Sequence, residues 1–258
     1  MKYYVVDAFT DELFKGNPAG VCVTENELSA EKMQNIAAEN NLSETAFVRR
    51  AGDGYSLRWF TPVKEVDLCG HATLGTSFVI SNFVDTAASE LKFDTRSGVL
   101  TVCKEDDLFV MDFPSQAARK IVTSPLMEQA IGAAVVEAFV FADTLVLLVE
   151  DEACLQGVTP DFGLISQLAP HAVIVTAKGG DVDFVSRFFA PNVGVNEDPV
   201  TGSAHSILIP LWAKKLDKVK LTAKQISKRG GTLFCENHGE RVKIAGKAVL
   251  YLKGEINF

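Results

Sequence analysis

Two short turns in this 258-residue chain place glycine and other small residues directly before an apolar, helix-like run. They are CGHA (69–72) and TGS (201–203). A helix N-terminus offers backbone N–H groups that lack intrahelical acceptors, together with the positive end of the helix dipole. Each turn is therefore predicted to bind an anionic group such as a carboxylate or a phosphate. The plainer interpretation is that both glycines only permit a tight turn.

Both turns end a phrase that the chain repeats. RWFTPVKEVDLCGHATLG (58–75) and RFFAPNVGVNEDPVTGSAH (187–205) each pass from a strand-like run through a proline and an acidic loop to the glycine turn. Their first residues, Arg58 and Arg187, are 129 positions apart, which is half of the chain. Such spacing predicts two similar halves. Two matched turns favour the opposite walls of one cleft that grips a small acid.

Three titratable residues lie in or near these segments. His71 follows Gly70, where an imidazole could hydrogen-bond a substrate or relay a proton, or could simply satisfy its own helix end. Asp198 precedes Pro199, and Asp-Pro is a common turn pairing. Glu44 lies in NLSETAF, where the residues alone favour a solvated carboxylate between a helix and a strand. Residue types by themselves thus leave catalytic and structural roles open.

The elements of the first half must position the first turn. A short amphipathic helix is predicted from the N-cap Ser29 to the Asn40-Asn41 pair. The run HATLGTSFVISNFV after Gly70 is apolar around nearly its whole circumference, which is typical of a helix buried inside a domain. The strands predicted in this half are 1–6, 20–24, 45–49, 55–60, 91–93, 99–103 and 108–113.

The break PSQ (114–116) predicts the boundary between the halves. Beyond it, a second helix that is apolar on most sides begins at the second glycine turn and includes AHSILIPLWAKK (204–215). Shorter helices are predicted at 125–134 and 162–168. The strands predicted in this half are 135–140, 145–149, 173–176, 184–189, 231–235, 242–244 and 248–252.

Charge and composition exclude several classes of partner. The net charge is −8, the pI is near 5.1, and the basic clusters are only the pairs 214–215 and 228–229. Neither a nucleic acid nor an anionic membrane is therefore expected as a partner. The start MKYYVVDAFTDELF lacks the apolar core of a signal peptide, and no apolar run is long enough for a membrane span. We predict a cytoplasmic protein with a small-molecule partner.

The cysteines and histidines give no metal-binding or disulfide pattern. The five cysteines are an odd, widely spaced set without a CxxC pair, and the four histidines contain no HExxH motif. Reduced thiols, no disulfide framework and no metal site are therefore predicted.

Four segments together resemble the phenazine-biosynthesis-like, or PhzF-like, isomerases, a branch of the diaminopimelate-epimerase fold. The segments are VDAFTDELFKGNPAGV (6–21), NLSETAFV (41–48), FTPVKEVDLCGHATLG (60–75) and NEDPVTGSAH (196–205). They occur in the family's order and span most of the chain. The resemblance implies an α+β fold with two pseudo-symmetric halves, each a mostly antiparallel, barrel-like sheet around a central buried helix.

The same resemblance sets expectations for organisation and partners. It implies an N-terminal half at 1–114, a C-terminal half at 118–248, and a final segment, 249–258, that returns to the first half. The active site is expected in the cleft between the halves. The family uses no metal, flavin, nicotinamide or pyridoxal cofactor, and its typical members are homodimers.

The resemblance also assigns roles to residues. Glu44 matches the family's acid/base glutamate, whose pKa burial in a cleft can raise enough for proton transfer near neutral pH. His71 and Asp198 match residues that support the charge shift and orient the substrate. Asn17 lies in a turn near the cleft and either contacts substrate or only builds that turn. The expected backbone donors are Gly70, His71, Ala72, Gly202 and Ser203, the last with a hydroxyl as well.

The residues directly before the two glycines bear on the mechanism. Diaminopimelate epimerases and proline racemases of this fold use one cysteine in each half, whereas here these two positions are Cys69 and Thr201. A threonine hydroxyl cannot replace a thiolate near pH 7, so racemisation by two thiols is disfavoured. Cys69 is then interpreted as a small buried filler. Glu197, next to Asp198, is interpreted as a solvent-facing neighbour.

We therefore predict a cofactor-independent isomerase that moves a carbon-bound proton on a small carboxylic acid, for which cyclic and amino-bearing acids are the candidates. Glu44 removes the proton and returns it elsewhere on the molecule. An amino-acid epimerase or racemase that uses Glu44 with another group is the alternative enzyme. A catalytically silent protein that binds small acids on the same scaffold is the alternative outside catalysis. The sequence leaves the substrate and the pathway open.

Overall fold

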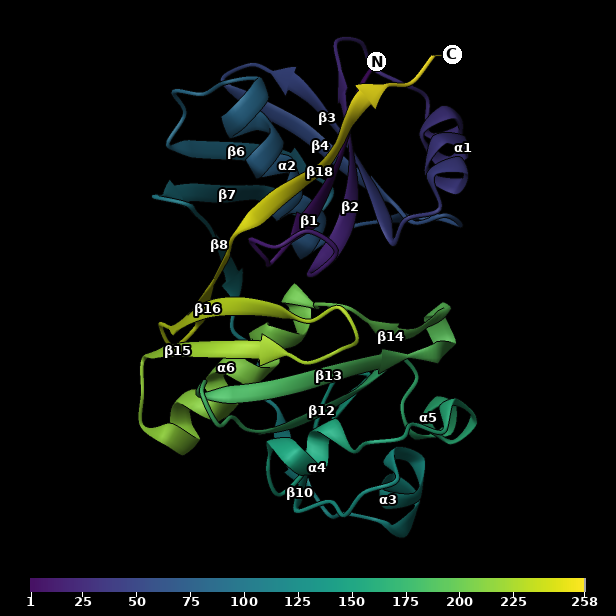
Figure 1. Ribbon diagram of the computed structural model, residues 1–258, viewed down its shortest axis with the longest axis vertical. Helices are drawn as coiled ribbons and strands as arrows, with labels where there is room; N and C mark the ends of the chain where they lie inside the picture. The colour runs from purple at the N-terminus through teal and green to yellow at the C-terminus, as the bar shows by residue number, and fades with distance from the viewer. Residues whose placement is uncertain (258) are drawn as a thin grey trace. The chain divides into compact units, whose positions relative to one another are not determined.

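The structure, a computed structural model, describes residues 1–257 as two compact units (Figure 1). Unit 1 contains Met1–Asp112 together with the C-terminal stretch that begins at Ala245, and unit 2 contains Phe113–Ile244. Each unit combines a mixed, mostly antiparallel arrangement of strands with one long buried helix and shorter helices. The predicted α+β fold class with two similar halves is confirmed.

In the sheet of unit 1, the first strand lies between the last strand and the second one. The strands are β1 (Lys2–Ala8), β2 (Asn17–Thr24), β3 (Glu44–Ala51), β4 (Gly54–Phe60), β5 (Glu65–Val66), β6 (Glu90–Thr95), β7 (Gly98–Glu105), β8 (Leu108–Pro114) and β18 (Ala248–Glu255). β1 pairs antiparallel with both β18 and β2. β2–β3 and β4–β6 are parallel pairs, whereas β3–β4, β4–β5, β6–β7 and β7–β8 are antiparallel.

The two helices of unit 1 follow their predicted signals. α1 (Ala30–Asn40) begins after Ser29, whose hydroxyl accepts from the N–H of Lys32, and it ends where Asn41 adopts a left-handed conformation. α2 (Gly70–Phe83) packs against β1, β2, β3 and β18 and is buried on most sides, as its sequence predicts. The hydroxyl groups of Thr73, Thr76 and Ser77 bond to carbonyls one turn earlier, as when Ser77 donates to Thr73 O at 2.8 Å.

Unit 2 repeats this plan. Its strands are β9 (Arg119–Ile121), β10 (Glu137–Phe141), β11 (Thr144–Leu148), β12 (Ala172–Lys178), β13 (Phe184–Ala190), β14 (Val195–Asp198), β15 (Lys220–Gln225), β16 (Gly231–Asn237) and β17 (Arg241–Gly246), which runs into unit 1. β10 pairs antiparallel with β9 and β11, β11–β12 and β13–β15 are parallel, and β12–β13, β13–β14 and β15–β16 are antiparallel. The strands of unit 2 thus pair in the same order as those of unit 1, with the same alternation of parallel and antiparallel pairs.

The helices of unit 2 include a buried one that contains a proline. They are α3 (Pro125–Ile131), α4 (Glu152–Gln156), α5 (Phe162–Leu168), the 3-10 turn η1 (Pro191–Val193) and α6 (Gly202–Leu216). Pro210 lies inside α6 and has no N–H to give to the carbonyl of Ser206. The N–H of Gln116 donates to that carbonyl instead, at 3.0 Å. The buried helix therefore tolerates its proline.

Some elements escaped sequence analysis. β15 was not among the predicted strands, although Leu221, Ala223 and Gln225 alternate inward along it. α4 and the short strands β5, β9 and β14 were also not predicted. The glycine turn at 230–231 joins β15 to β16. Among residues 1–257, no helix has both the length and the apolar character that a membrane span requires.

Candidate active site

The start of α2 is an open helix end. Its first turn closes where the N–H and the hydroxyl of Thr73 both donate to Cys69 O, at 3.1 Å and 2.6 Å. The N–H groups of Gly70, His71 and Ala72 precede this bond and so have no intrahelical acceptor. These are the backbone donors that the sequence predicts on the first turn. Together with the helix dipole they make this end suited to a carboxylate.

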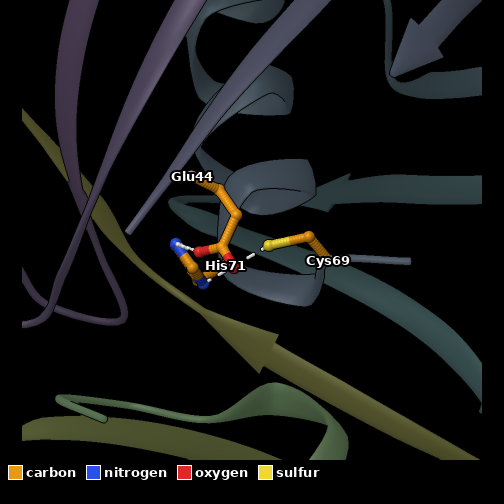
Figure 2. A group of neighbouring side chains, drawn as sticks. All are labelled: Glu44, Cys69 and His71. Carbon is orange, nitrogen blue, oxygen red and sulfur yellow. Dashed lines mark hydrogen bonds and ion pairs between the residues drawn. The ribbon is translucent and has the colours of Figure 1, made fainter. Parts of the chain in front are cut away.

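Glu44 is brought to this helix end by the sheet. It is the first residue of β3 and lies opposite Ala19 of the parallel neighbour β2. Its side chain is 20% exposed, and its Oε2 lies 3.2 Å from Nε2 of His71. Figure 2 shows the side chains of Glu44, His71 and Cys69 gathered beside α2, with dashed lines from His71 to the other two. Glu44 and His71, predicted separately, thus contact each other.

His71 is enclosed but not fully hydrogen-bonded. Its side chain is only 7% exposed, and its Nδ1 lies 3.5 Å from Cys69 Sγ. The contact with Glu44 has the distance of an ion pair but not the alignment of a hydrogen bond, so Nε2 has no hydrogen-bond partner among residues 1–257. Burial lowers the pKa of His71 to about 3. The ring is therefore neutral near pH 7.

These three side chains are of types that bind metal ions, and their geometry tests that possibility. One ligand atom from each of Glu44, Cys69 and His71 lies within 4.8 Å of the others. However, Cys69 lies at Nδ1 and Glu44 at Nε2, and a metal ion binds one ring nitrogen along its lone pair. The thiol and the carboxylate therefore approach different nitrogens of the ring within one compact cluster. The absence of a metal site stays a prediction.

Asn17 lies at the start of β2, fully buried, two residues before the position opposite Glu44. The turn before it requires glycine, because Gly16 has a φ of +64° and a Cβ there would lie 2.2 Å from Ala8 O. This fixed turn delivers the side chain of Asn17 on the same face of β2 as Ala19. A contact between Asn17 and substrate stays a prediction.

Asp198 and its neighbours brace the second helix end, in unit 2. Asp198 Oδ2 accepts a short hydrogen bond from the hydroxyl of Thr201, the N-cap of α6. Gln225 Nε2 donates to Asp198 O at 2.7 Å, and its Oε1 accepts from Thr201 N at 2.9 Å. Gly202 is buried and Ser203 is exposed at the start of α6. Sequence analysis missed Gln225, whose signal was the alternation along β15.

The repeated phrase is explained by a repeated ion pair. Arg58 donates to both carboxylate oxygens of Glu65, at 2.7 Å and 2.8 Å. Arg187 binds Glu197 in the same two-pronged way, at 2.8 Å and 3.1 Å, and also donates to Val158 O at 2.7 Å. The interpretation of Glu197 as solvent-facing is wrong, because its side chain is only 24% exposed. Each of these bidentate ion pairs holds the loop that precedes a buried helix.

His205 is a second buried histidine, and no role was predicted for it. It lies in the first turn of α6, fully buried, with Nδ1 2.8 Å from Thr201 O. Burial lowers the pKa of His205 to about 4. It occupies the position of Thr73 in the first copy and, like Thr73, bonds to the carbonyl of the N-cap residue.

Known proteins resemble this chain in sequence and in structure. A family model described as phenazine biosynthesis-like protein matches residues 6–254. A Pseudomonas aeruginosa protein, named an uncharacterized isomerase, is 49% identical over 99% of this chain and 98% of its own length. An Enterococcus faecalis protein of the PhzF family superposes with a TM-score of 0.97, at 49% identity, over 100% of this chain and 99% of its own. A hydroxyproline epimerase from Agrobacterium vitis shares the fold alone, with a TM-score of 0.62 and 11% identity over 99% of this chain and 90% of its own.

Proposed function

Since the chain belongs to the phenazine biosynthesis-like (PhzF-like) family, we propose that it is a cofactor-independent isomerase that moves a carbon-bound proton on a small carboxylic acid. Glu44 is the general acid/base. The observation that carries the proposal is the contact between Glu44 and the buried, neutral imidazole of His71 at the open end of α2. A proton acceptor and several N–H donors thus lie together at a site suited to a carboxylate.

The end of α2 is proposed to bind the substrate, whose carboxylate accepts from the N–H groups of Gly70 and Ala72. The end of α6, with Gly202 and Ser203, is proposed as a second anion-binding helix end in unit 2. Asn17 contacts the bound molecule in this scheme. Asp198 orients a polar group of the substrate, and the hydrogen bond from Thr201 holds its carboxylate in place.

The proton transfer has two steps. The ionised carboxylate of Glu44 removes a proton from an acidic carbon, and the electron pair of the broken C–H bond enters the conjugated system of the substrate. Nε2–H of His71 and the helix N–H groups stabilise the negative charge that develops. Glu44, now a carboxylic acid, returns that proton to a different carbon. The product is an isomer of the substrate, and Glu44 is ionised again.

Two alternatives use the same scaffold. An epimerase or racemase would return the proton to the other face of the same carbon, and the fold shared with a hydroxyproline epimerase favours testing this. Racemisation by two cysteine thiols is disfavoured, because the residue before Gly202 is Thr201. Its hydroxyl donates to Asp198 and does not ionise near pH 7. A catalytically silent protein would bind the acid without exchanging any carbon-bound proton.

A ligand screen comes first. Cyclic and amino-bearing carboxylic acids, with trans-4-hydroxy-L-proline among them, are tested for thermal stabilisation of the protein. A ligand at 100 times its dissociation constant adds about 2.7 kcal/mol to the free energy of unfolding, which is readily detected. Stabilisation by none of a broad panel would contradict the class of substrate proposed here.

The deciding experiment is deuterium incorporation. A stabilising acid is incubated with the protein in heavy water, and carbon-bound deuterium and product stereochemistry are measured by NMR and mass spectrometry. We expect exchange that falls by about 10²–10⁴-fold in Glu44→Gln. Glu39→Gln, an exposed carboxylate in α1, is the matched control and should exchange like the wild type.

Each other outcome has a definite meaning. Undiminished exchange in a folded Glu44→Gln variant would remove Glu44 from the mechanism. Deuterium at the original carbon with loss of chirality would identify racemisation instead of isomerisation. Binding without any exchange by the wild type would identify the silent alternative.

A further inference from the structure

The two buried histidines differ in what faces their Nδ1 atoms. In His71, Nδ1 lies 3.5 Å from the thiol sulfur of Cys69. In His205, Nδ1 lies 2.8 Å from the backbone carbonyl of Thr201. A neutral imidazole carries one proton, and its neighbours decide which nitrogen holds it. Both rings are neutral near pH 7, because burial lowers both pKa values.

For His205 the neighbour settles the tautomer. A carbonyl oxygen only accepts hydrogen bonds, so Nδ1 must carry the proton and donate it to Thr201 O. Nε2 is then a bare acceptor, and it has no hydrogen-bond partner within the described chain. The ring packs beside Phe184, with 5.8 Å between the ring centroids.

For His71 the neighbours require the opposite tautomer. The carboxylate of Glu44 lies 3.2 Å from Nε2 and, when ionised, can only accept. A bare Nε2 would place its lone pair against a negatively charged oxygen, which is unfavourable in a buried site. The proton therefore belongs on Nε2. Nδ1 must then act as an acceptor, and the S–H group of Cys69 faces it as a donor.

We propose that Cys69 is a positioning residue whose S–H group donates to Nδ1 of His71 and keeps the ring proton on Nε2, where it faces Glu44. The catalytic consequence rests on the proposed function, because Nε2–H is there the donor for the developing charge. The tautomer itself does not depend on any activity. Cys69 is thus more than the small filler that its sequence position suggests.

This role differs from that of a nucleophilic cysteine. Activation of the thiol would require His71 to take its proton and become an imidazolium. Burial holds the pKa of His71 at about 3, which opposes that transfer. The imidazole therefore stays neutral, and its interaction with the thiol is a hydrogen bond rather than a thiolate–imidazolium pair.

The filler and the donor roles make opposite predictions for two substitutions. Alanine keeps an apolar side chain but loses the donor, whereas serine is polar but keeps an O–H group in nearly the same place. If Cys69 only fills space, Cys69→Ala is better tolerated than Cys69→Ser. If it donates to His71, the order is reversed.

The first test needs no substrate. Protein labelled with ¹⁵N-histidine is examined by long-range ¹H–¹⁵N correlation NMR, and His71→Asn and His205→Asn variants assign the two buried rings. We expect an Nε2–H tautomer for His71 and an Nδ1–H tautomer for His205 in the same spectrum. Cys69→Ala should shift His71 toward Nδ1–H, and Cys69→Ser should restore Nε2–H. An Nδ1–H tautomer of His71 in the wild type, or no response to Cys69→Ala, would overturn the proposal.

The second test measures the consequence for exchange. We expect Cys69→Ala to lower the deuterium exchange rate by about tenfold, and Cys69→Ser to exceed it by at least fivefold. Cys22, buried in the apolar cluster around Met33 and Phe47, is the matched control. There alanine should be tolerated better than serine, and neither should change the tautomer of His71.

Equal rates in Cys69→Ala and Cys69→Ser would refute the positioning role. An Nε2–H tautomer in a wild type that exchanges no proton would refute the proposed function and leave the assignment for Cys69 intact.

Discussion

The buried histidines predict a specific loss of stability in mild acid. In the folded protein, burial lowers the pKa of His205 from 6.5 to about 4 and that of His71 from 6.5 to about 3. Below pH 6.5 the unfolded chain binds a proton at each position, whereas the folded chain does not. The free energy of unfolding therefore falls as the pH falls. For His205 this loss stops below about pH 4, where the folded ring is protonated as well.

The size of the effect follows from these pKa values. Each histidine removes about 1.4 kcal/mol from the free energy of unfolding for each pH unit below 6.5. Between pH 6.5 and 4.5 the two together remove about 5 kcal/mol. That loss is comparable with the entire stability of many domains, about 5–15 kcal/mol. Mild acid should therefore bring the protein close to unfolding without any change in its surface charge pairs.

His205 gives the cleaner test, because burial and its hydrogen bond with the Thr201 carbonyl account for its shifted pKa, whereas His71 lies beside Glu44. In His205→Asn, the side-chain N–H₂ can take the place of Nδ1–H and donate to Thr201 O. We expect lower stability at pH 7 but a pH dependence that is shallower by about 1.4 kcal/mol per unit. Urea unfolding at several values between pH 5 and 6.5 measures the slope. His171→Asn, at an exposed histidine, is the matched control and should leave the slope unchanged.

The chosen window separates the histidines from the carboxylates. Arg58 lowers the pKa of Glu65 through hydrogen bonds, so the stability from that pair is lost only as the pH falls below about 4.5. Because His71 lies in unit 1 and His205 in unit 2, separate unfolding transitions would each respond to one histidine. An unchanged slope in His205→Asn would show that this ring is protonated in the folded protein, which would refute the burial argument.

Three further predictions concern the braces of the site, and each is measured by urea unfolding. Glu197→Gln should lower the free energy of unfolding by about 1–3 kcal/mol, because it leaves the largely buried guanidinium of Arg187 without its carboxylate; a loss below about 0.5 kcal/mol would contradict this. Gly16→Ala should lower the free energy of unfolding more than Gly52→Ala. Both glycines have positive φ, but only at residue 16 would a Cβ lie against a backbone oxygen. Equal losses would refute this steric argument. Gln225→Ala should lower the free energy of unfolding by about 1–3 kcal/mol, because Thr201 N and Asp198 O lose their hydrogen-bond partner. An unchanged free energy of unfolding would show that neither hydrogen bond contributes to stability.

Local signals in the sequence were sufficient for much of the fold. The helix of 70–83 was predicted because its apolar residues surround it, and Ser29 marked the start of α1 as an N-cap. β15 was missed because it is short and polar on one face, so its alternation is visible only once Leu221 and Gln225 are known to point inward. The pairing of β2 with β3 in parallel, which places Glu44 opposite Ala19, has no local signal at all.

The candidate site divides in the same way. The residue types at 69–72 predict an open helix end, and the structure has one. The contacts of His71 with both Cys69 and Glu44 were not predictable, because they depend on how β3 and α2 pack. The ion pairs of Arg58 and Arg187 could have been predicted from the sequence, since each repeated segment contains an arginine followed by a glutamate in the acidic loop. Burial of Glu197 required the structure.

The two copies also indicate which positions hold the scaffold and which hold the chemistry. Counted back from each glycine, Glu65 and Glu197 are equivalent, and both bind an arginine. At the next position the copies differ, because Val66 stands where the second copy has Asp198. The residues after the two glycines, His71 and Ser203, differ as well. The shared positions supply the ion pairs that brace the loops and the glycines that begin the helices. The positions that differ include His71 and Asp198, to which we assign roles in the proposed reaction. A reaction with a single proton acceptor requires such a difference between the copies.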